Sequence, residues 1–365
     1  MSFEKVGFIG LGLIGGSIAK TIKKKYPDTT LIATARHADT IQEAHDFGTI
    51  ENDTLLPLSD FADCDYIFLC TPVQQNLIYL KELKSVIKPS CIITDVGSVK
   101  SDIHKAVTAL DIEANFIGGH PMCGSEKTGF FNATEYLLEN AYYIITPTAK
   151  TAPAQLEDFH ALVKSLGSVP MILDYEKHDF ATAAISHLPH IIASSLVNLV
   201  SDLDDEQETM RTIAAGGFKD ITRIASSSPV MWQNICLSNQ EQILKLTDCY
   251  IHALQNIRSS VADAKSDDII SFFQSAKDYR DSITTPVRGS LQKNYSVYCD
   301  LVDEAGAIAT LATIMASHNI SIKNIGILHN REYEDGVLQI EFYEEDALEK
   351  AVKLMKDNHY VVHRR

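Results

Sequence analysis

The sequence of 365 residues is short of positive charge. Lysine and arginine number 32 against 48 aspartate and glutamate residues, which gives a formal net charge of −16 at pH 7. Surfaces that bind nucleic acid or anionic membranes need clustered lysine and arginine. The charge balance therefore argues against both partners, and an anionic substrate would need a local basic pocket in an acidic chain.

Paired cysteines and a secretion signal are also lacking. No basic-then-apolar segment opens the sequence, because Gly10, Gly12, Gly15 and Gly16 interrupt the first apolar stretch. The seven cysteines form an odd set without a C-x-x-C pair. Such a set is typical of reduced thiols, and together these features predict a cytoplasmic protein.

No uninterrupted apolar run is long enough to suggest a membrane span. The longest run, near residues 181–200, contains His187, Pro189, His190 and Ser194. A spanning helix needs about 20 predominantly apolar residues. We therefore expect a buried helix at this position and no membrane partner.

The first part of the chain has the pattern of an α/β domain, and the length predicts two or three domains in all. Short β-like runs alternate with helical patterns, which predicts a parallel sheet. Helices are expected at Gly15–Lys25, Ile41–Phe47 and Ala154–Leu166. The expected strands are Lys5–Ile9, Leu31–Ala35, Tyr66–Cys70, Cys91–Asp95, Asn115–Gly118, Tyr142–Ile145 and Met171–Leu173.

Two further regions follow. From Asp179 to about Gln292, apolar residues recur at helical spacing, which predicts an all-helical domain; its helices are apolar on more than one face, which favours a homodimer. The final residues have a β-α-β-β-α-β order typical of a ferredoxin-like α+β unit. We predict domains at 1–175, 176–292 and 293–365. The last domain's elements are expected at Tyr295–Leu301, Ala305–His318, Ile325–His329, Val337–Phe342, Ala347–Asn358 and Val361–Val362.

A glycine motif indicates a nucleotide site. The segment from Gly10 to Gly15 reads G-x-G-x-x-G, directly after a predicted strand and at the start of a predicted helix. In a Rossmann fold these glycines allow a tight turn, a close approach to the pyrophosphate and close packing of helix on strand. A glycine-rich turn in another α/β protein would share the motif, but the flanking elements favour a dinucleotide. The expected cofactor-binding residues are Gly10, Gly12, Leu13, Ile14, Gly15, Thr71 and Pro72.

The end of the second predicted strand bears on the choice of cofactor. NAD sites usually have an acidic residue there, which binds the ribose hydroxyls. Here Ala35 takes that position and Arg36 follows. An arginine pairs with the 2′-phosphate of NADP, whereas a solvated loop cation would do nothing. We therefore predict NADP as the preferred cofactor and NAD as the alternative.

Ser98 and His120 are candidates for the chemistry. Ser98 lies between a predicted strand and a predicted helix, where it is either a hydrogen-bonding group or a helix N-cap. His120 follows a predicted strand in a glycine-rich loop, and ligands of open α/β sheets bind at such strand ends. A loop histidine that bonds a carbonyl is the ordinary alternative.

Three histidines and one arginine mark the helical region. His178, His187 and His190 lie close together in sequence, but no further ligands have the spacing of a metal site, so we predict none. Arg223 lies in a helical pattern within an acidic chain. Its alternatives are a substrate contact and a surface ion pair, which would contribute little.

Taken in order, six segments resemble the prephenate/arogenate dehydrogenase family of tyrosine biosynthesis over nearly the whole chain. They read G-L-G-L-I-G-G-S, D-V-G-S-V-K, G-G-H-P-M-C-G-S-E, S-H-L-P-H, G-F-K-D-I-T-R-I-A and P-V-M-W. The final unit, with Asp303 to Gly306 at its first turn, resembles an ACT domain, an amino-acid-binding regulatory module. The resemblance implies NAD(P)-dependent oxidative decarboxylation of prephenate to 4-hydroxyphenylpyruvate, or of arogenate, with tyrosine as an inhibitor.

The resemblance also implies roles for individual residues. His120 matches the catalytic histidine that accepts the proton of the ring hydroxyl, and Ser98 matches a residue that contacts the same hydroxyl. Arg223 matches the arginine that binds a substrate carboxylate. The other matched positions line the pocket, support it or gate its entry: His178, His187, His190, Glu126, Asp220 and Trp232.

Two other functions compete with this interpretation. A hydroxyacid-type dehydrogenase also combines a Rossmann domain with a helical domain, but it would need a catalytic lysine in the helical part. A non-catalytic regulator that senses NADP and an amino acid would need no proton acceptor. The combination of His120, Ser98 and Arg223 favours the enzyme over both.

Overall fold

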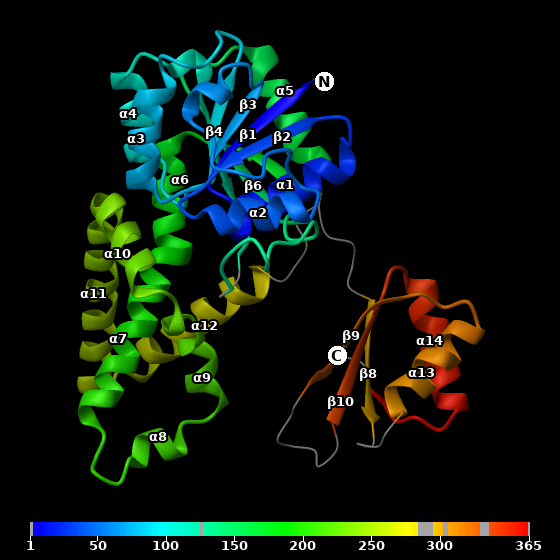
Figure 1. Cartoon of the computed structure of the whole chain (residues 1–365). Helices are drawn as coiled ribbons and strands as arrows, with labels where there is room; N and C mark the ends of the chain where they lie inside the picture. The colour runs from blue at the N-terminus through cyan, green and yellow to red at the C-terminus, as the bar shows by residue number, and fades with distance from the viewer. Residues whose placement is uncertain (1–2, 125–126, 284–294, 302–305, 329–335, 364–365) are drawn as a thin grey trace. The chain divides into compact units, whose positions relative to one another are not determined.

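The computed structural model in Figure 1 describes residues 3–124, 127–283, 295–301, 306–328 and 336–363. The chain forms two compact units, Met1–Leu254 and Gln255–Arg365. The predicted domain boundary at residue 175 falls at the first residue of helix α6 (Tyr175–Thr182), and the one at residue 292 lies outside the described residues.

The first unit opens with a parallel sheet, as the alternating pattern predicts. Its strand order is β2-β1-β3-β4. Val6 pairs with Leu31 on one side and with Tyr66 on the other, which puts β1 at the centre. Strands buried on both faces need continuous apolar runs, and these strands have them. The strands are β1 (Lys5–Ile9), β2 (Thr30–Thr34), β3 (Tyr66–Leu69) and β4 (Ile92–Asp95).

Helices cover both faces of this sheet. Ile18 of α1 and Phe159 of α5 pack with Phe8 in one core cluster, while Leu80 of α3 and Ile103 of α4 pack in another. Figure 1 shows the same two groups of helices on opposite sides of the strands. The arrangement confirms the predicted Rossmann-type layers. The helices are α1 (Leu13–Lys25), α2 (Ala38–Asp46), α3 (Val73–Leu83), α4 (Ser101–Ala109) and α5 (Pro153–Ser165).

A second sheet corrects the expectation of parallel strands throughout. Strand β6 (Tyr142–Pro147) runs antiparallel to β5 (Ile117–Pro121) and parallel to β7 (Val169–Ile172). A parallel bridge between Ile93 and Phe116 joins β5 to β4. A parallel pair needs a long crossover, usually a helix, and the described residues between β5 and β6 form turns instead. Local strand patterns do not reveal this reversal.

The glycines of the nucleotide loop have distinct structural reasons. Gly10 has φ +96°, and a Cβ there would lie 2.8 Å from the carbonyl oxygen of Cys70. A Cβ on Gly15 would lie 2.5 Å from the carbonyl oxygen of Gly10. A Cβ on Gly12, in contrast, would meet nothing within 4 Å. Two glycines are therefore required by packing, and the third borders open space.

The rest of the first unit is helical, as predicted. Helix α6 (Tyr175–Thr182), a π-helical turn (Ala183–His187) and α7 (Leu188–Leu203) follow one another without a break. Pro189 cannot donate a backbone hydrogen bond, and the π-helical turn precedes it, with the N–H of Leu188 bonded to Ala183. Then come α8 (Thr209–Ile213), α9 (Gly216–Thr222), a 3₁₀ turn (Arg223–Ser226), α10 (Pro229–Ser238) and α11 (Gln240–Ala262), whose residues from Gln255 on belong to the second unit.

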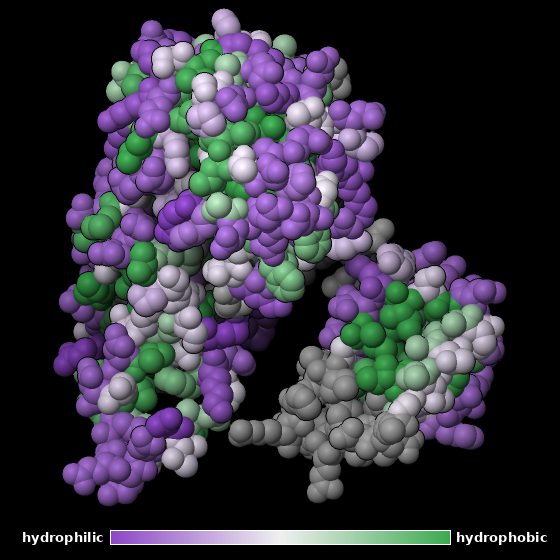
Figure 2. Space-filling model, viewed as in Figure 1, coloured by the Kyte–Doolittle hydropathy of each residue, from purple (hydrophilic) through white to green (hydrophobic). Residues whose placement is uncertain are grey.

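The apolar run is not the buried helix that its composition predicts. The segment Tyr175–Leu203 is long and apolar enough to pass a membrane-span test of length and composition, yet only 17% of its most apolar window is buried. Ile185, Leu199 and Leu203 are among its exposed residues. Figure 2 also shows apolar side chains on the surface of the helical region. A single chain leaves much of this helix uncovered.

The second unit contains α12 (Ser266–Ile283) and the predicted ferredoxin-like fold. The sheet has the order β11-β8-β10-β9, and its paired strands are antiparallel. Alternate strand residues such as Val297 and Ile340 pack against Leu311 and Val352 from the two helices. Asp303 lies outside the described residues. The elements are β8 (Tyr295–Leu301), α13 (Ala307–Ser317), β9 (Ile322–Leu328), β10 (Gly336–Phe342), α14 (Glu345–Asp357) and β11 (Val362–His363).

The loop geometry predicts unequal effects of adding one methyl group. Gly15→Ala overpacks the junction of α1 with Gly10, so it should lower the free energy of unfolding by about 1–3 kcal/mol. Gly12→Ala is the matched control, and it should change stability by no more than about 0.5 kcal/mol. Urea unfolding of the cofactor-free protein measures both. Equal losses in the two variants would contradict this explanation of Gly15.

Candidate active site

The start of helix α1 can receive a dinucleotide. Gly12 is the N-cap residue, no side chain caps the helix, and its first turn contains no acidic residue. The free N–H groups of a helix start attract phosphate, and the helix dipole adds positive potential. Leu13 and Ile14 form the first turn, beside the open space at Gly12. These residues fit the pyrophosphate of NAD or NADP.

Two neighbouring strand ends complete this part of the site. Gly10 donates its N–H to Thr34, the last residue of β2, over 2.8 Å. Beyond that strand Arg36 is exposed, and its Nε donates to Nε2 of His37 over 2.9 Å. After β3, the methyl group of Thr71 lies against Gly10, and Pro72 caps α3. The predicted cofactor residues therefore gather at one edge of the sheet.

A buried ion pair fixes the next strand ends. Asp95, at the end of β4, pairs with the Nζ of Lys100, and both side chains are fully buried. Lys100 Nζ also donates to the carbonyl of Gly119 over 2.8 Å, and the N–H of Gly97 donates to the Asp95 carboxylate over 2.9 Å. Burial lowers the pKa of Lys100. This pair holds the backbone beside His120 in place.

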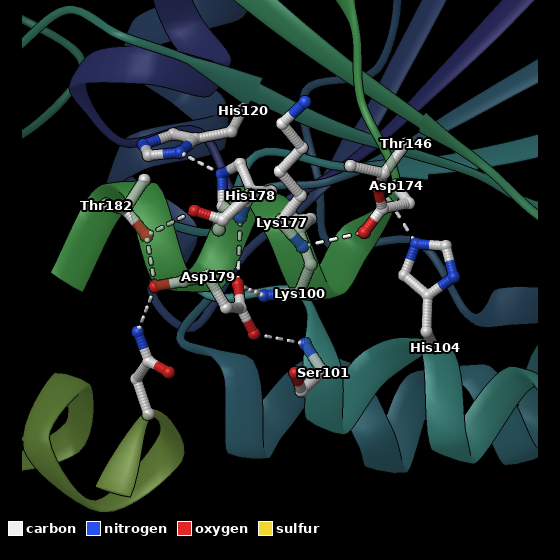
Figure 3. Close-up of polar contacts among 12 residues, drawn as sticks. Lys100, Ser101, His104, His120, Thr146, Asp174, Lys177, His178, Asp179 and Thr182 are labelled. Carbon is white, nitrogen blue, oxygen red and sulfur yellow. Dashed lines mark hydrogen bonds and ion pairs between the residues drawn. The ribbon is translucent and has the colours of Figure 1, made fainter. Parts of the chain in front are cut away.

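His120 belongs to a chain of three side chains from two elements (Figure 3). Its Nδ1 lies 2.8 Å from Nε2 of His178, and Nδ1 of His178 lies 2.8 Å from Oδ1 of Asp179. A carboxylate only accepts, so Nδ1 of His178 carries a proton, and Nε2 of a neutral His178 accepts. The bond from His120 must then be donated by its Nδ1. The lone pair of neutral His120 is therefore on Nε2.

The protonation state of His120 suits a base. Strand β5 includes His120, so this residue is in the strand and not in the loop after it as predicted. Burial and the neighbouring His178, Lys100 and His187 hold the pKa of His120 well below its ordinary value. The imidazole is thus neutral at physiological pH, with Nε2 ready to accept a proton.

Asp179 replaces Ser98 as the cap of helix α4. The carboxylate of Asp179 accepts the N–H of Lys100 over 2.8 Å and that of Ser101 over 2.7 Å. The alternative in which Ser98 is the N-cap is wrong, because the N-cap residue is Lys100 and the cap comes from α6. Ser98 is partly buried in the turn between β4 and α4. Sequence reasoning missed Asp179, although it adjoins His178.

His187 and His190 have opposite tautomers. Nδ1 of His187 lies 3.2 Å from the amide nitrogen of Asn239, a donor, so the proton of neutral His187 is on Nε2. Nδ1 of His190 lies 2.8 Å from the carbonyl oxygen of Ser186, an acceptor, so its proton is on Nδ1. Burial lowers the pKa of His187 to about 4. His187 thus offers a hydrogen-bond donor at Nε2, and His190 offers an acceptor at Nε2.

Trp232 joins this histidine cluster. Its ring stacks on His190 with centroids 3.7 Å apart and meets His187 edge-on at 6.0 Å. The Trp232 Nε1 atom is buried without a hydrogen-bond partner. Among the residues that the structure describes, no group of three or more His, Cys, Asp or Glu side chains is arranged to hold a metal.

The remaining predicted residues lie at the edge of this arrangement or outside it. Arg223 begins the 3₁₀ turn after α9, and α7 packs against both of these elements. The side chains of Arg223 and Asp220 are exposed. Glu126 lies outside the described residues. The predicted pairing of the acids with Arg223 therefore stays a prediction.

Family models and sequence relatives agree on the kind of protein. Residues 18–172 match the nucleotide-binding domain of prephenate dehydrogenase, and residues 174–275 match its dimerization domain. A prephenate dehydrogenase of Bacillus subtilis is 39% identical over 94% of this chain and 93% of its own. A cyclohexadienyl dehydrogenase of Zymomonas mobilis is 30% identical over 78% of this chain and 97% of its own.

Solved structures agree as well. The prephenate dehydrogenase of Aquifex aeolicus, in complex with hydroxyphenyl propionate and NAD+, superposes with a TM-score of 0.72 at 28% identity and covers 78% of this chain and 99% of its own. The arogenate dehydrogenase of Synechocystis has a TM-score of 0.69 at 31% identity, covering 77% and 100%. The chain thus belongs to the prephenate dehydrogenase family of oxidoreductases.

Proposed function

We propose that this chain catalyses the NAD(P)-dependent oxidative decarboxylation of prephenate to 4-hydroxyphenylpyruvate in tyrosine biosynthesis. The observation that carries the proposal is the chain from His120 through His178 to Asp179, which leaves Nε2 of His120 as a proton acceptor. His120, near the end of β5, lies at the same end of the strands as the nucleotide loop that follows β1. The relatives that match over nearly the whole chain are prephenate dehydrogenases.

The chemistry follows from this tautomer. NAD(P)+ held at the nucleotide loop would supply the acceptor for a hydride from the ring carbon that carries the 4-hydroxyl. Nε2 of His120 accepts the hydroxyl proton as the hydride leaves, and Ser98 contacts the same hydroxyl. The ring carboxylate departs as CO₂, and its bonding electrons make the ring aromatic. His120 then returns the proton to the phenolate oxygen, so the reaction releases no net proton.

Substrate binding falls to the helical region. Arg223 pairs with a substrate carboxylate, since a planar guanidinium binds a carboxylate through two parallel hydrogen bonds. His187 and His190 supply the donor and the acceptor described above, while Trp232 forms a wall of the cavity. For Asp220, and for Glu126 outside the described residues, the resemblance supports a role in gating the entry by pairing with Arg223.

Arogenate is the alternative substrate. It differs from prephenate only in an amino group in place of the side-chain keto group. An arogenate dehydrogenase and a cyclohexadienyl dehydrogenase are both among the similar proteins. We propose prephenate because the relatives from Bacillus subtilis and Lactococcus lactis, at 39% and 34% identity, are prephenate dehydrogenases.

The dimer and the regulation are also proposed. The helical region matches a dimerization domain, and α7 exposes apolar residues, so we propose a homodimer in which a partner subunit covers them. The ferredoxin-like fold of the second unit supports an ACT-type regulatory module that binds tyrosine. Two similar proteins match this chain over 97% and 99% of their own length, but they cover only 78% of it. These matches support a catalytic part that works without that module.

The first test is a rate matrix together with a variant of His120. Wild-type protein should reduce NADP or NAD with prephenate faster than with arogenate. His120→Asn should bind cofactor normally but lower kcat by about 10²–10⁴. Because the lowered pKa of His120 keeps the base unprotonated in mild acid, wild-type kcat should not fall as the pH drops through about 6.5. Near-normal turnover of His120→Asn would remove it from the proton-accepting role.

The second test concerns the cofactor. The 2′-phosphate of NADP would gain a charge-assisted hydrogen bond from Arg36, worth about 1.5–3 kcal/mol, or roughly ten- to hundredfold in kcat/KM. Ala35→Asp combined with Arg36→Ser should reverse the preference. Arg211→Ser, which removes another exposed arginine, is the control and should leave the preference unchanged. A wild-type preference for NAD of tenfold or more would exclude this role of Arg36.

The third test concerns tyrosine. A chain that ends at Gln292 lacks the ferredoxin-like fold and should keep its activity while losing inhibition by tyrosine. Initial rates at increasing tyrosine concentrations compare it with the full chain. Unchanged inhibition of the shortened enzyme would show that tyrosine competes at the active site instead.

A further inference from the structure

Asn239 connects two parts of the helical region at a buried point. It follows α10 and directly precedes α11, and it is 4% exposed. Its Nδ2 lies 2.8 Å from the backbone oxygen of Asp179 and 3.2 Å from Nδ1 of His187. The backbone oxygen only accepts, so the atom that faces it must be the amide nitrogen. One N–H therefore remains for His187.

This second N–H determines the tautomer of His187. A neutral imidazole has one donor and one acceptor nitrogen, and the amide forces Nδ1 to accept. We propose that Asn239 is a positioning residue for substrate binding, which holds His187 as the Nε2–H tautomer and so presents a hydrogen-bond donor to a substrate oxygen. The proposal rests on the function proposed above and deepens it.

The tautomer of His187 is important because its surroundings keep this ring neutral. The titratable groups that interact with His187 are Asp179 and His178 of α6, His190 of α7 and His120 of β5. Burial outweighs the carboxylate and lowers the pKa of His187 to about 4, so the imidazolium, which would donate from both nitrogens, is not available near neutral pH. Without Asn239, the Nδ1–H tautomer would turn an Nε2 lone pair toward the substrate oxygen.

His190 shows that each histidine has its tautomer fixed by its own partner. Ser186 fixes His190 with its proton on Nδ1, the opposite of His187. The π-helical turn Ala183–His187 lies directly before the helix that carries His190. A donor and an acceptor therefore lie three residues apart in sequence, His187 fixed by the oriented amide of Asn239 and His190 by the backbone oxygen of Ser186.

The test is Asn239→Asp in the full-length enzyme. A carboxylate only accepts, so it draws the proton of His187 to Nδ1 and leaves a lone pair on Nε2. It also raises the pKa of His187. We expect KM for prephenate to rise by about tenfold or more with a much smaller change in kcat. The KM defect should shrink as the pH falls, because the imidazolium regains its Nε2–H. Wild-type KM should lack this pH-dependent step.

Asn115→Asp is the matched control. The amide nitrogen of Asn115 also donates to two backbone oxygens, those of Pro89 and Cys91, each over 2.9 Å. The substitution removes two hydrogen bonds, as Asn239→Asp does, but it does not affect the partner of His187. This control should lose stability but keep the wild-type KM and its pH dependence. If Asn239→Asp behaves like Asn115→Asp in both respects, the proposed role of Asn239 is overturned.

A measurement on the unmodified protein covers the case in which Asn239→Asp does not fold. Nitrogen NMR of histidine-labelled wild-type enzyme distinguishes the two tautomers, and the signal absent from His187→Gln identifies His187. We expect an unprotonated Nδ1, and a protonated Nδ1 would refute the proposal. Inactivity of the wild type with every substrate and cofactor would instead refute the proposed function, so the two failures are distinguishable.

Discussion

The carboxylate of Asp179 joins the two halves of the site. A buried charge is costly unless hydrogen bonds compensate it, and Asp179 accepts them from His178 and from the backbone N–H groups of Lys100 and Ser101. The latter two open helix α4, where the helix dipole also favours negative charge. Hydrogen bonding to His178, Ser101 and Lys100 lowers the pKa of Asp179 despite burial. The helical region is thereby tied to the sheet edge that carries His120.

The tautomers of the four histidines follow, directly or through His178 or Asn239, from carboxylate and backbone oxygens, which can only accept. The Asp179 carboxylate orients His178, which in turn orients His120. The backbone oxygens of Asp179 and Ser186 do the same for Asn239 and His190. No charged histidine is needed for this arrangement. It depends on burial, because water at any of these positions would allow the rings to exchange tautomers.

Local signals in the sequence predict the parts of the fold that local interactions determine. The glycine motif, the apolar strands and the β-α-β-β-α-β order all specify their elements within short stretches, and the described structure has them. The errors concern distant partners. Ser98 occupies a capping position by sequence, but the cap comes from Asp179. Strand β6 runs antiparallel to β5, and the described residues between these strands form turns and no helix. Neither Asp179 nor Asn239 belongs to a recognisable motif, because each forms hydrogen bonds with residues that are distant in the sequence.

The helical segment Tyr175–Leu203, which begins at the site, shows why composition alone mispredicts the burial of an apolar run. His178 and Asp179, near its start, are fully buried and bonded to the sheet domain, whereas Leu199 and Leu203 at its other end are exposed. Lipid would cover the apolar residues but leave polar neighbours such as Asn198 and Asp202, also exposed, without hydrogen-bond partners. A second protein surface can satisfy both kinds of residue, in agreement with the dimerization domain that this region matches. In the proposed dimer, the partner subunit would bury the apolar residues that a single chain leaves exposed.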